Sequence, residues 1–490
     1  MNRLAKEVGA LHFVGIGGIG MSGIAEVLVM IGYTVQGSDL KDSANVTRLR
    51  EKGVEIAIGH DAKNIMSKSG DLPSAVVISS AVSQDNVELT AAREAKVPVI
   101  RRAEMLAELM RLKTAIAIGG THGKTTTTSM VGQMLDTAGF DPTVINGGIV
   151  NAFGSNTRLG ESDWMVVEAD ESDGTFTRLP ASVVAVTNMD AEHMEHYGSF
   201  DAVRAAYRQF IMNIPYYGYA VMCTDHAEVQ ALVPRVSDRK IITYGYNKQA
   251  DVQASNVRID KNGSTFDVKF ADWLFEDDSK HANGLALKDV YLPMLGEHNV
   301  QNCLVALTVA QQMGVEPPIM RKALENFNGV KRRFTQTGEV NGITVIDDYA
   351  HHPIEIETVL KTARAAVADI GGKVVVVMQP HRYSRLEDLF DEFSACFHDA
   401  DSVLIADVYE AGEEPIEGIN RNALVESATK RGHKDVAALQ SREVLAKAVA
   451  DRADEGDFVI LMGAGDITAW AYALPEELEA EFKARKGAAA

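Results

Sequence analysis

A glycine-rich turn followed by Lys124 and Thr125 is the first feature of this sequence that could do chemistry. The turn (residues 119–123, GGTHG) follows a short apolar run of strand length and precedes a helical pattern that ends at Gly139. In such a loop, backbone N–H groups surround phosphate oxygens, the lysine neutralises them and the threonine holds Mg²⁺. The spacing departs from G-x-x-x-x-G-K-[ST] because position 118 is Ile118, so an ordinary strand-to-helix turn remains the simpler alternative.

A second glycine turn lies near the N-terminus. Gly15, Gly17 and Gly20 fit the pattern G-x-G-x-x-G between an apolar run and a helical pattern, and Asp39 follows Gly20 by 19 residues. The glycines permit a tight turn and close approach of a diphosphate, and the acid can accept ribose hydroxyls. NAD and a UDP-sugar share this diphosphate-plus-ribose geometry, so the pattern does not choose between them.

An acidic stretch begins where a third apolar run (residues 164–167) ends. Glu168 stands at the tip of this predicted strand, and Asp170, Glu171 and Asp173 follow. A carboxylate beside a phosphate-binding loop is the expected partner of Mg²⁺, which prefers oxygen ligands. A solvated acidic loop is the alternative for the three later acids, and it explains Glu168 less well.

Further polar clusters also follow predicted strands, at the sheet edge where open α/β sheets bind ligands. They are residues 187–193 (TNMDAEH), 347–353 (DDYAHHP), 379–385 (QPHRYSR) and 463–466 (GAGD). Arg382 and Arg385 suit a carboxylate or a phosphate. His193 and His60, taken alone, are more typical of surface histidines than of ligands.

The elements that position these residues predict an α/β fold in three domains, which the length of 490 residues also favours. Residues 1–107 should form a Rossmann-like domain and residues 108–326 a central P-loop ATPase-type domain. The central domain should carry a small antiparallel sheet, because alternating runs flank Lys261-Asn262-Gly263, a strong hairpin signal. Residues 327–490 again alternate strands and helices and should form a second Rossmann-like domain.

Composition narrows the class of protein. The net charge of −20 argues against broad nucleic-acid binding, and no segment has the unbroken apolar length of a membrane span. We expect no signal peptide. The three cysteines, Cys223, Cys303 and Cys396, lie far apart, so we expect buried, reduced thiols in a cytoplasmic protein.

Two anion-binding turns in separate domains predict two phosphorylated ligands, one of them ATP. An enzyme that joins two substrates by using ATP fits this set of residues. A motor or a GTPase switch would leave the other two domains without a role.

The motifs resemble those of the Mur ligases, in one order over nearly the whole chain. They are residues 15–23 (GIGGIGMSG), 120–126 (GTHGKTT), 168–173 (EADESD), 187–193, 296–302 (GEHNVQN), 331–334 (KRRF), 347–353 and 379–385. No lysine lies between Tyr197 and Ile214, where several sister ligases use a carbamylated lysine. This absence and the glycine-fingerprint first domain resemble the alanine-adding branch.

The resemblance implies a cytoplasmic, ATP-dependent ligase of peptidoglycan synthesis, hence of cell-wall biogenesis, cell shape and division. ATP would phosphorylate the lactyl carboxylate of UDP-N-acetylmuramate, and the amine of L-alanine would attack the acyl phosphate. The products would be UDP-N-acetylmuramoyl-L-alanine, ADP and phosphate. The implied cofactors are ATP and two Mg²⁺ ions. The partners would be these small molecules alone, with no nucleic acid, no membrane insertion and a monomer or weak homodimer.

The resemblance also implies roles for individual residues. Catalytic roles fall to Lys124, Glu168, His193 and His351. ATP would be bound by Gly120, Thr121, His122, Gly123, Lys124, Thr125, Thr126, Asn299, Asn302, Arg333 and Asp348. The UDP-sugar would be bound by Gly17, Gly18, Ile19, Gly20, Ser38, Asp39, His60 and Ser79. The amino acid would be bound by Tyr349, His351, Arg382 and Arg385. Magnesium would be held by Thr125, Glu168 and His193.

Three alternatives remain open at this point. Within the family, a recycling ligase would attach a tripeptide to the same UDP-sugar. An NAD-dependent dehydrogenase would leave Lys124, Thr125 and Glu168 without a role. A non-catalytic nucleotide-binding regulator would bind ATP and form no amide. For Asn299, near the start of a predicted helix, a simple capping role is also open.

Overall fold

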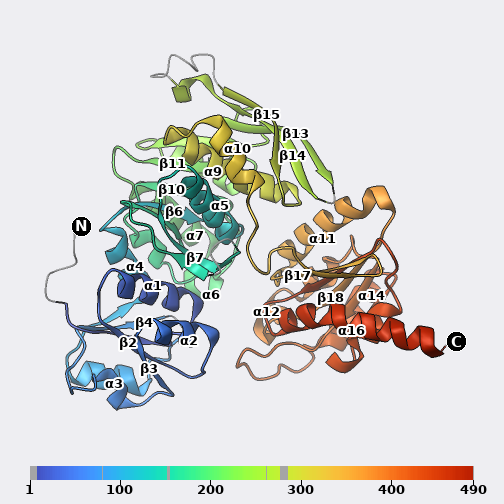
Figure 1. Cartoon of the computed structure of the whole chain (residues 1–490), viewed down its shortest axis with the longest axis horizontal. Helices are drawn as coiled ribbons and strands as arrows, with labels where there is room; N and C mark the ends of the chain where they lie inside the picture. The colour runs from blue at the N-terminus through green and yellow to red at the C-terminus, as the bar shows by residue number, and fades with distance from the viewer. Residues whose placement is uncertain (1–7, 80, 152–154, 261, 276–284, 489–490) are drawn as a thin grey trace. The chain divides into compact units, whose positions relative to one another are not determined.

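A computed structural model describes residues 8–79, 81–151, 155–260, 262–275 and 285–488. These residues form three sheets covered by helices, which confirms the expected α/β class (Figure 1). By contacts the chain divides into two compact units, which are described separately. The first unit holds residues 1–256, 266–290 and 301–328, and the second holds residues 257–265, 291–300 and 329–490.

The first sheet has the strand order β3-β2-β1-β4-β5, and its strands are parallel. The strands are β1 (Leu11–Val14), β2 (Val35–Asp39), β3 (Glu55–Ile58), β4 (Ala75–Ile78) and β5 (Val99–Arg101). The helices are α1 (Ile19–Met30), α2 (Ala44–Glu51), α3 (Val87–Glu94) and α4 (Arg102–Met110). The order reverses beside β1, and at such a switch point the carboxyl ends of the strands leave a crevice for ligands. The glycine turn directly follows β1.

The central sheet has ten strands in the order β15-β14-β13-β12-β11-β10-β6-β9-β7-β8. The strands are β6 (Thr114–Gly119), β7 (Thr143–Val150), β8 (Ser155–Arg158), β9 (Trp164–Glu168), β10 (Val183–Val186), β11 (Tyr219–Cys223), β12 (Lys240–Gly245), β13 (Val252–Asp260), β14 (Gly263–Phe270) and β15 (Leu285–Leu292). The helices are α5 (Lys124–Thr137), α6 (Met194–Tyr197), α7 (Phe200–Met212), α8 (Ala227–Leu232), α9 (Glu297–Gln312) and α10 (Pro317–Glu325). Strand β6 pairs in parallel with β9 and β10, so the segments that follow these three strands share one edge.

The expected appended strands are β13, β14 and β15, and they continue the central sheet instead of forming a sheet of their own. The hairpin turn falls between β13 and β14 as expected, and its first residue, Lys261, lies outside the described residues.

The third sheet, in the second unit, has the order β16-β17-β21-β18-β19-β20. Its strands are β16 (Thr335–Val340), β17 (Ile343–Asp348), β18 (Val374–Met378), β19 (Ser402–Ile405), β20 (Val436–Ala438) and β21 (Phe458–Met462). Its helices are α11 (Pro353–Val367), α12 (Tyr383–Asp388), α13 (Phe390–Ala395), α14 (Arg421–Lys430), α15 (Leu445–Ala450) and α16 (Ile467–Ala488). Only β16 is antiparallel among the pairings of this sheet.

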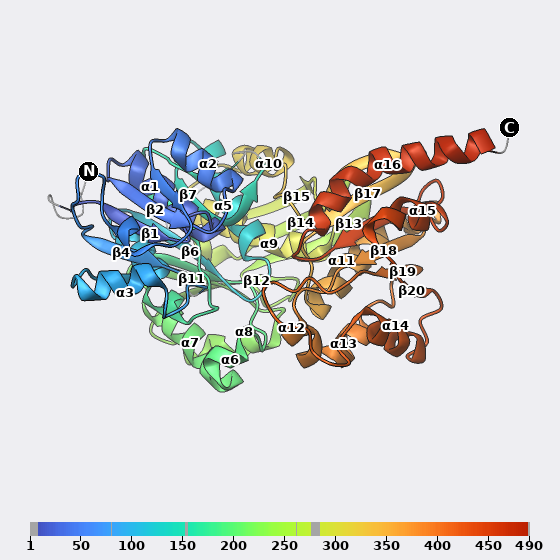
Figure 2. The same ribbon diagram turned by 90° about the horizontal axis from the view of Figure 1, so that it is seen from below.

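Alternate side chains of the third sheet enter two different cores. Val374, Val376 and Met378 face α11, α13 and α14, whereas Val375 and Val377 face α15 and α16. Figure 2 shows α13 and α14 on one side of these strands and α15 and α16 on the other. Burial on both faces explains why the strands read as unbroken apolar runs, as parallel strands usually do.

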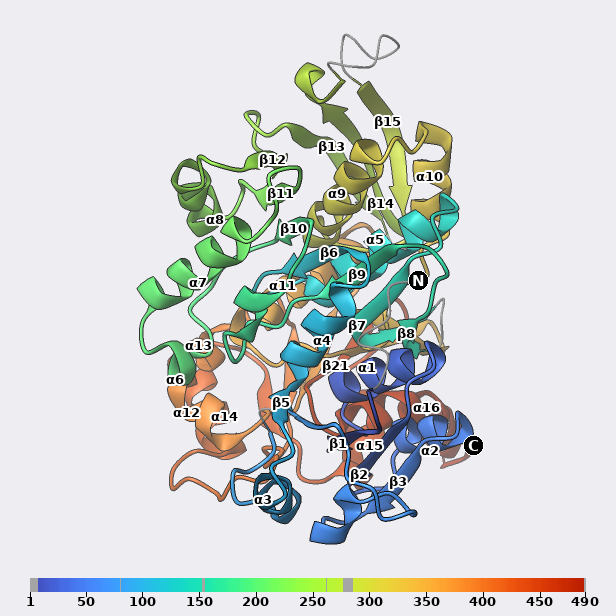
Figure 3. The same cartoon turned by 90° about the vertical axis from the view of Figure 1, so that its left-hand side faces the viewer.

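Helix α1 packs against the central sheet within the first unit, and Figure 3 shows it alongside β7 and β8. Gly23 permits this approach, because a Cβ at that position would lie 2.6 Å from Thr157 Oγ1. Asn156 on β8 donates from Nδ2 to the Ile19 carbonyl (2.7 Å) and accepts from Arg48 at Oδ1 (3.2 Å). The helix that follows the first glycine turn is therefore fixed to the domain that carries the second.

The predicted elements agree with the structure best where they are buried and apolar. The strand predicted at 458–462 is β21, and the helix predicted from residue 200 is α7. The helix predicted at 303–313 in fact begins at Glu297, so Asn299 lies inside its first turn. The three cysteines are buried and form no disulfide bond, as expected. Within the described residues, we find no helix long and apolar enough to span a bilayer.

Replacing Ile460 by alanine should destabilise the second unit by about 2–5 kcal/mol, because this fully buried side chain would leave a cavity in the core. Urea unfolding followed by circular dichroism measures the change. The matched control is Ile370→Ala, since Ile370 is 57% exposed and its loss should change the free energy of unfolding by less than about 0.5 kcal/mol. Equal effects of the two changes would contradict the assigned core.

Candidate active site

The loop between β6 and α5 has the geometry of a phosphate-binding turn. Gly120 and Gly123 have φ values of 139° and 80°, which favour glycine. A Cβ on Gly120 would lie 1.9 Å from Thr187 Oγ1, and a Cβ on Gly123 would lie 2.6 Å from Asn302 Oδ1. The turn therefore has no room for side chains at these two positions, which explains the glycine spacing.

The segment after β10 holds this loop in place. Thr187 N donates to the Gly119 carbonyl (3.1 Å), and Thr187 Oγ1 donates to the His122 carbonyl (2.7 Å). Asn188 contacts the same residue twice, because Oδ1 accepts from His122 N (2.7 Å) and Nδ2 donates to the His122 carbonyl (3.0 Å). The hydroxyl of Thr121 accepts from Asp190 N (2.8 Å). These bonds preorganise the loop before any ligand arrives.

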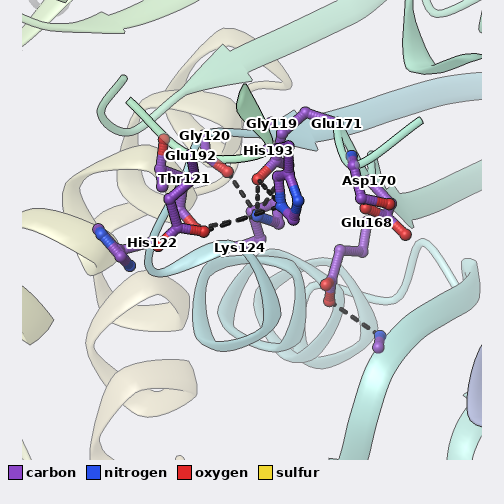
Figure 4. Close-up of polar contacts among 12 residues, drawn as sticks. Gly119, Gly120, Thr121, His122, Lys124, Glu168, Asp170, Glu171, Glu192 and His193 are labelled. Atoms are coloured by element: carbon purple, nitrogen blue, oxygen red, sulfur yellow. Dashed lines mark hydrogen bonds and ion pairs between the residues drawn. The ribbon is translucent and has the colours of Figure 1, made fainter. Parts of the chain in front are cut away.

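Lys124 lies beneath the loop and is paired with Glu171 (Figure 4). Its Nζ donates to the carbonyls of Gly120 (2.6 Å) and Thr121 (3.0 Å) and lies 2.8 Å from Glu171 Oε2. Burial lowers the pKa of the Lys124 ammonium, but the carboxylates of Glu171 and Glu168 outweigh burial and place this pKa above its ordinary value. The site therefore keeps a permanent positive charge under the turn.

Glu168 ends β9, the neighbour of β6, as the sequence predicts for a metal ligand. Its Oε2 accepts from Gly147 N (2.8 Å), and the described residues donate no hydrogen bond to its Oε1. Asn146 joins the two sides of this site: its Nδ2 donates to Thr125 O (3.2 Å), and its Oδ1 accepts from Gly147 N (2.9 Å). Thr125 itself is buried in the first turn of α5, as is Thr126.

His193 adopts a left-handed conformation with φ of 56°. Its Nε2 lies 3.9 Å from Glu171 Oε1 and 3.7 Å from Glu192 Oε2, so an imidazole and two carboxylates converge beside Lys124. Non-glycine residues with positive φ are uncommon and are often found at functional sites. The structure thus places this predicted residue with Lys124 and Glu171.

The first glycine turn is built around the carbonyl of Ser38, which accepts from Gly15 N (2.8 Å) and Ile16 N (3.0 Å). Gly17 N donates to Asp39 Oδ2 (2.8 Å). The carboxylate that is expected to bind a ribose therefore also fixes the backbone of the turn. Gly18 is the N-cap of α1 and supplies no side-chain cap. The N–H groups of Ile19 and Gly20 in the first turn of α1 can therefore meet an anion.

The other residues predicted for the UDP-sugar follow the strand ends of the same sheet. Ser79 directly follows β4 and is half-buried. His60 follows β3, and its Nδ1 lies 3.2 Å from Ser38 Oγ and 3.1 Å from Glu88 Oε1. His60 is therefore not a free surface histidine, because its imidazole is fixed by buried partners.

In the second unit, Asp348 organises the KRRF turn. Its Oδ2 accepts from Phe334 N and its Oδ1 from Ala350 N, both at 2.7 Å. Burial raises the pKa of Asp348 to about 6, against the lowering effect of the Arg333 charge. Arg333 lies 5.4 Å from the ring centre of Tyr349, within range of a cation–π contact.

The polar segments after β17 and β18 meet through aromatic contacts. His351 lies 4.9 Å from the Tyr349 ring and 6.0 Å from the His381 ring. His351 Nδ1 donates to the Tyr349 carbonyl (2.9 Å), which leaves the lone pair on Nε2. Burial lowers the pKa of His351, and nearby Arg385 lowers it further despite the opposing effect of Glu355. A lowered pKa favours the neutral imidazole, whose Nε2 carries the lone pair.

Arg382 is the N-cap residue of helix α12 after β18, and Arg385 lies in the first turn of that helix. Arg382 has φ of 64° and is half-exposed, with Nη1 3.5 Å from Glu413 Oε1. Arg385 donates from Nη1 to the His381 carbonyl (3.4 Å). Both guanidinium groups lie close enough to His381 to lower its pKa, and Arg385 has the same effect on His351, which the sequence predicted for the amino-acid site.

The two predicted adenine residues differ in their surroundings. Asn302 is buried and packs against Gly123 of the phosphate-binding turn, within the first unit. Asn299 belongs to the second unit, where its Nδ2 donates to the Leu295 carbonyl (2.8 Å). The Asn299 side chain donates in this bond, whereas a capping side chain accepts from backbone N–H groups, so this bond is not the capping interaction considered as the alternative.

Sequence reasoning missed the importance of Glu171, Asn188 and Asn146. A solvated loop was the alternative interpretation for Glu171, and it is wrong, since the residue is 3% exposed and paired with Lys124. Asp170 is also bound, by Arg102 at 2.7 Å. Glu171 and Asn188 each follow a parallel strand, which was the available signal, whereas Asn146 lies within β7. Their partners lie 47 residues from Glu171, 66 from Asn188 and 21 from Asn146.

Three family profiles match successive parts of the chain. They are "Mur ligase family, catalytic domain" at residues 10–114, "Mur ligase middle domain" at residues 118–310 and "Mur ligase, glutamate ligase domain" at residues 332–465. The chain belongs to the Mur ligase family. The three-domain architecture expected from the sequence is that of this family.

Individual relatives cover almost all of this Mur ligase. A UDP-N-acetylmuramate–L-alanine ligase of Brucella ovis is 57% identical over 98% of the chain and 100% of the relative. A protein of the same name from Maricaulis maris is 58% identical over 97% and 98%. The UDP-N-acetylmuramate–alanine ligase of Thermotoga maritima matches in structure with a TM-score of 0.78 and 28% identity, over 97% of this chain and 100% of that one. A murein peptide ligase of Psychrobacter arcticus matches with a TM-score of 0.68 and 25% identity, over 96% and 99%.

Replacing Gly120 by alanine should lower kcat/KM for ATP by at least about tenfold, because the new Cβ would overlap Thr187 Oγ1 and displace the turn. Steady-state kinetics with varied ATP measures this. Gly139→Ala is the matched control: Gly139 also has positive φ (82°), but no atom lies within 4 Å of its Cβ position. A normal kcat/KM in Gly120→Ala would contradict the crowded loop.

Proposed function

We propose that this Mur ligase joins the amine of L-alanine to the lactyl carboxylate of UDP-N-acetylmuramate in peptidoglycan precursor synthesis. ATP is consumed through an acyl-phosphate intermediate, and ADP and phosphate are released. One observation carries the proposal: relatives 57–58% identical over at least 97% of the chain have the name UDP-N-acetylmuramate–L-alanine ligase. Family membership also favours a UDP-sugar over NAD at the first glycine turn.

The chemistry explains why ATP is needed. A carboxylate resists attack by an amine because its oxygen is a poor leaving group, and phosphorylation converts that oxygen into phosphate. The remaining tasks are positioning the reactants and neutralising charge. The positive charge of Lys124, held by Glu171 and Glu168, suits the β- and γ-phosphates. ATP would compete with Glu171 for this ammonium.

Magnesium fits the oxygen atoms offered near the loop. Glu168 Oε1 and the Thr125 hydroxyl are hard oxygen donors of the kind that Mg²⁺ prefers, and the described residues donate no hydrogen bond to Glu168 Oε1. Bound there, Mg²⁺ would neutralise phosphate charge. His193 and Glu168 would hold a second ion, for which an imidazole is a less usual ligand. Two ions are therefore our proposal.

The substrates would occupy three sets of residues. The turn at residues 17–20, with Ser38, Asp39, His60 and Ser79, would bind the UDP-sugar through the N-terminus of α1. ATP would be bound by the phosphate-binding turn together with Thr126, Asn299, Asn302, Arg333 and Asp348. In the second unit, Arg382 and Arg385 would hold the carboxylate of L-alanine. His351 Nε2, the lone-pair nitrogen, could accept a proton from the attacking amine.

We propose domain boundaries at 107/108 and 326/327, which place one sheet in each domain. We also propose a cytoplasmic monomer or weak homodimer that acts on small molecules alone. Size-exclusion chromatography with light scattering tests the oligomeric state.

A recycling ligase for a tripeptide is the second candidate, favoured by the structural match to the Psychrobacter arcticus murein peptide ligase. Purified protein should be assayed with UDP-N-acetylmuramate, ATP and Mg²⁺, with L-alanine, glycine, L-serine or L-alanyl-γ-D-glutamyl-meso-diaminopimelate supplied separately. Phosphate release and product mass are measured. L-Alanine should support turnover, and dependence on the tripeptide alone would overturn the proposal.

Lys124→Ala should lower kcat by at least about a hundredfold, because the charge that neutralises the transferred phosphoryl group is lost. Calorimetric binding of UDP-N-acetylmuramate should survive, since the first glycine turn is untouched. The control is Lys248→Ala, which removes an exposed lysine of the same domain. Full turnover by Lys124→Ala would refute the phosphoryl-transfer role.

Arg382→Ala should raise KM for L-alanine by about tenfold and KM for ATP by much less, because it removes a charge-assisted contact to the amino-acid carboxylate. Initial rates with each substrate varied in turn separate the two effects. Arg431→Ala is the control, since Arg431 pairs with Asp391 on the surface of the same unit. Equal changes in both KM values would argue against an acceptor role.

A further inference from the structure

A buried carboxylate lies beneath the predicted UDP-sugar site and belongs to no set of residues assigned so far. Glu88 occupies the first turn of α3, and its side chain is fully buried. Its partners come from β1, from the end of β2 and from the segment after β3, which are separate parts of the sheet edge where the ligand is expected.

Both oxygens of Glu88 are saturated with hydrogen bonds. Oε2 lies 2.8 Å from His12 Nε2 and accepts from Ser38 Oγ at 2.8 Å. Oε1 lies 3.1 Å from His60 Nδ1 and accepts from Asn64 Nδ2 (2.9 Å) and from Asp61 N (3.3 Å). Five groups thus converge on one carboxylate, and two of them, Ser38 and His60, are predicted ligand residues.

The charge of Glu88 fixes the direction of these bonds. Burial raises the pKa of Glu88, but the hydrogen bonds from His12, Asn64 and Ser38 outweigh burial and bring the pKa down to about 2. An ionised carboxylate can only accept hydrogen bonds, so every partner must donate. His60 must carry its proton on Nδ1, which leaves Nε2 as an acceptor when the ring is neutral.

His12 is held by a second contact. Gln36 Nε2 lies 3.4 Å from His12 Nδ1 and donates to the Ile65 carbonyl at 2.9 Å, so this amide group is a donor. The ionised Glu88 carboxylate requires His12 Nε2 to donate, and the Gln36 amide lies on the other side of the same ring. The cluster is therefore a network in which five groups donate to one buried carboxylate.

We propose that Glu88 is a positioning residue for the UDP-sugar, one that fixes the Ser38 and His60 side chains and the glycine turn above them. The Ser38 carbonyl accepts from Gly15 N and Ile16 N, so holding Ser38 also holds the turn. Side chains locked by supporting hydrogen bonds lose less freedom on binding and so favour affinity. This inference rests on the proposed function, since it names the UDP-sugar as the ligand.

A purely structural role is the alternative, in which Glu88 only stabilises the first domain. The two differ in which kinetic constant changes. Positioning acts on one substrate, whereas loss of the fold lowers the amount of active enzyme and lowers kcat without raising KM for the UDP-sugar alone.

The test uses Glu88→Gln in the full chain, with UDP-N-acetylmuramate, ATP and L-alanine varied in turn. Glutamine keeps the shape, but its amide N–H groups face donors. KM for UDP-N-acetylmuramate should rise by about tenfold to a hundredfold, and KM for ATP and for L-alanine should change by less than about twofold. The matched control is Glu94→Gln, an exposed glutamate of the same helix, which should behave like the wild type. An unchanged KM, or equal changes in all three, would overturn the proposal.

A double-mutant cycle with His60→Ala adds a second readout. If Glu88 acts through His60, then Glu88→Gln should raise KM less in the His60→Ala background than in the wild type. If Glu88→Gln raises KM for UDP-N-acetylmuramate by the same factor in both backgrounds, Glu88 does not act through His60.

Should Glu88→Gln fail to fold, Ser38→Ala and His60→Ala singly carry the test. Each should raise KM for the UDP-sugar selectively, and no change in either would overturn the proposal. A wild-type protein that does not turn over UDP-N-acetylmuramate refutes the proposed function instead. Wild-type turnover with a normal Glu88→Gln variant refutes only this inference.

Discussion

The pairing of the buried Lys124 ammonium with nearby carboxylates is the interaction on which the nucleotide site depends. An ammonium away from water is unfavourable unless opposite charges compensate it, and Glu171 and Glu168 provide that compensation. Glu168 ends β9 and Glu171 follows it, and the parallel pairing of β9 with β6 brings the carboxyl end of β9 beside the phosphate-binding turn. The segment after β10, on the other side of β6, secures the same turn through Thr187 and Asn188. The carboxyl ends of three adjacent strands thus supply the Lys124 ammonium, the carboxylates that compensate its charge and the hydrogen bonds that hold the turn.

The same constraint recurs in the other two sheets. In the first domain, Glu88 accepts hydrogen bonds from β1, from the end of β2 and from the segment after β3, and the glycine turn follows β1. In the second unit, the neighbouring strands β17, β21 and β18 are followed by the segments that hold His351, the GAGD sequence and Arg382, respectively. Parallel strands collect their carboxyl ends at one edge, so residues distant in sequence become neighbours there. Each sheet therefore presents one set of polar groups, as an enzyme with three substrates requires.

The two glycine turns are also joined through the framework of the first unit. Asn156 bonds to the first turn of α1, and Asn146 bonds to the first turn of α5. Asn156 Nδ2 lies 3.4 Å from the Asn146 carbonyl, which makes the connection continuous. Close approach of α1 at Gly23 makes this possible. A rigid connection between the two glycine turns suits a reaction in which the carboxylate of one ligand must lie next to the γ-phosphate of the other.

The sequence by itself was enough to predict the α/β class, both glycine turns and the family. It also predicted a phosphate-binding role for Lys124 and a metal-ligand role for Glu168. These predictions depend on local patterns and on motifs in a fixed order. It could not show that Glu171 is buried against Lys124, since an acidic loop looks the same whether solvated or paired. It also could not show that Glu88 gathers His12, Ser38 and His60, which lie between 28 and 76 residues from it. Those contacts follow from the pairing order of the strands. Only the tertiary structure decides that order. The order in turn decides which polar groups are buried away from water and must form hydrogen bonds or ion pairs with each other.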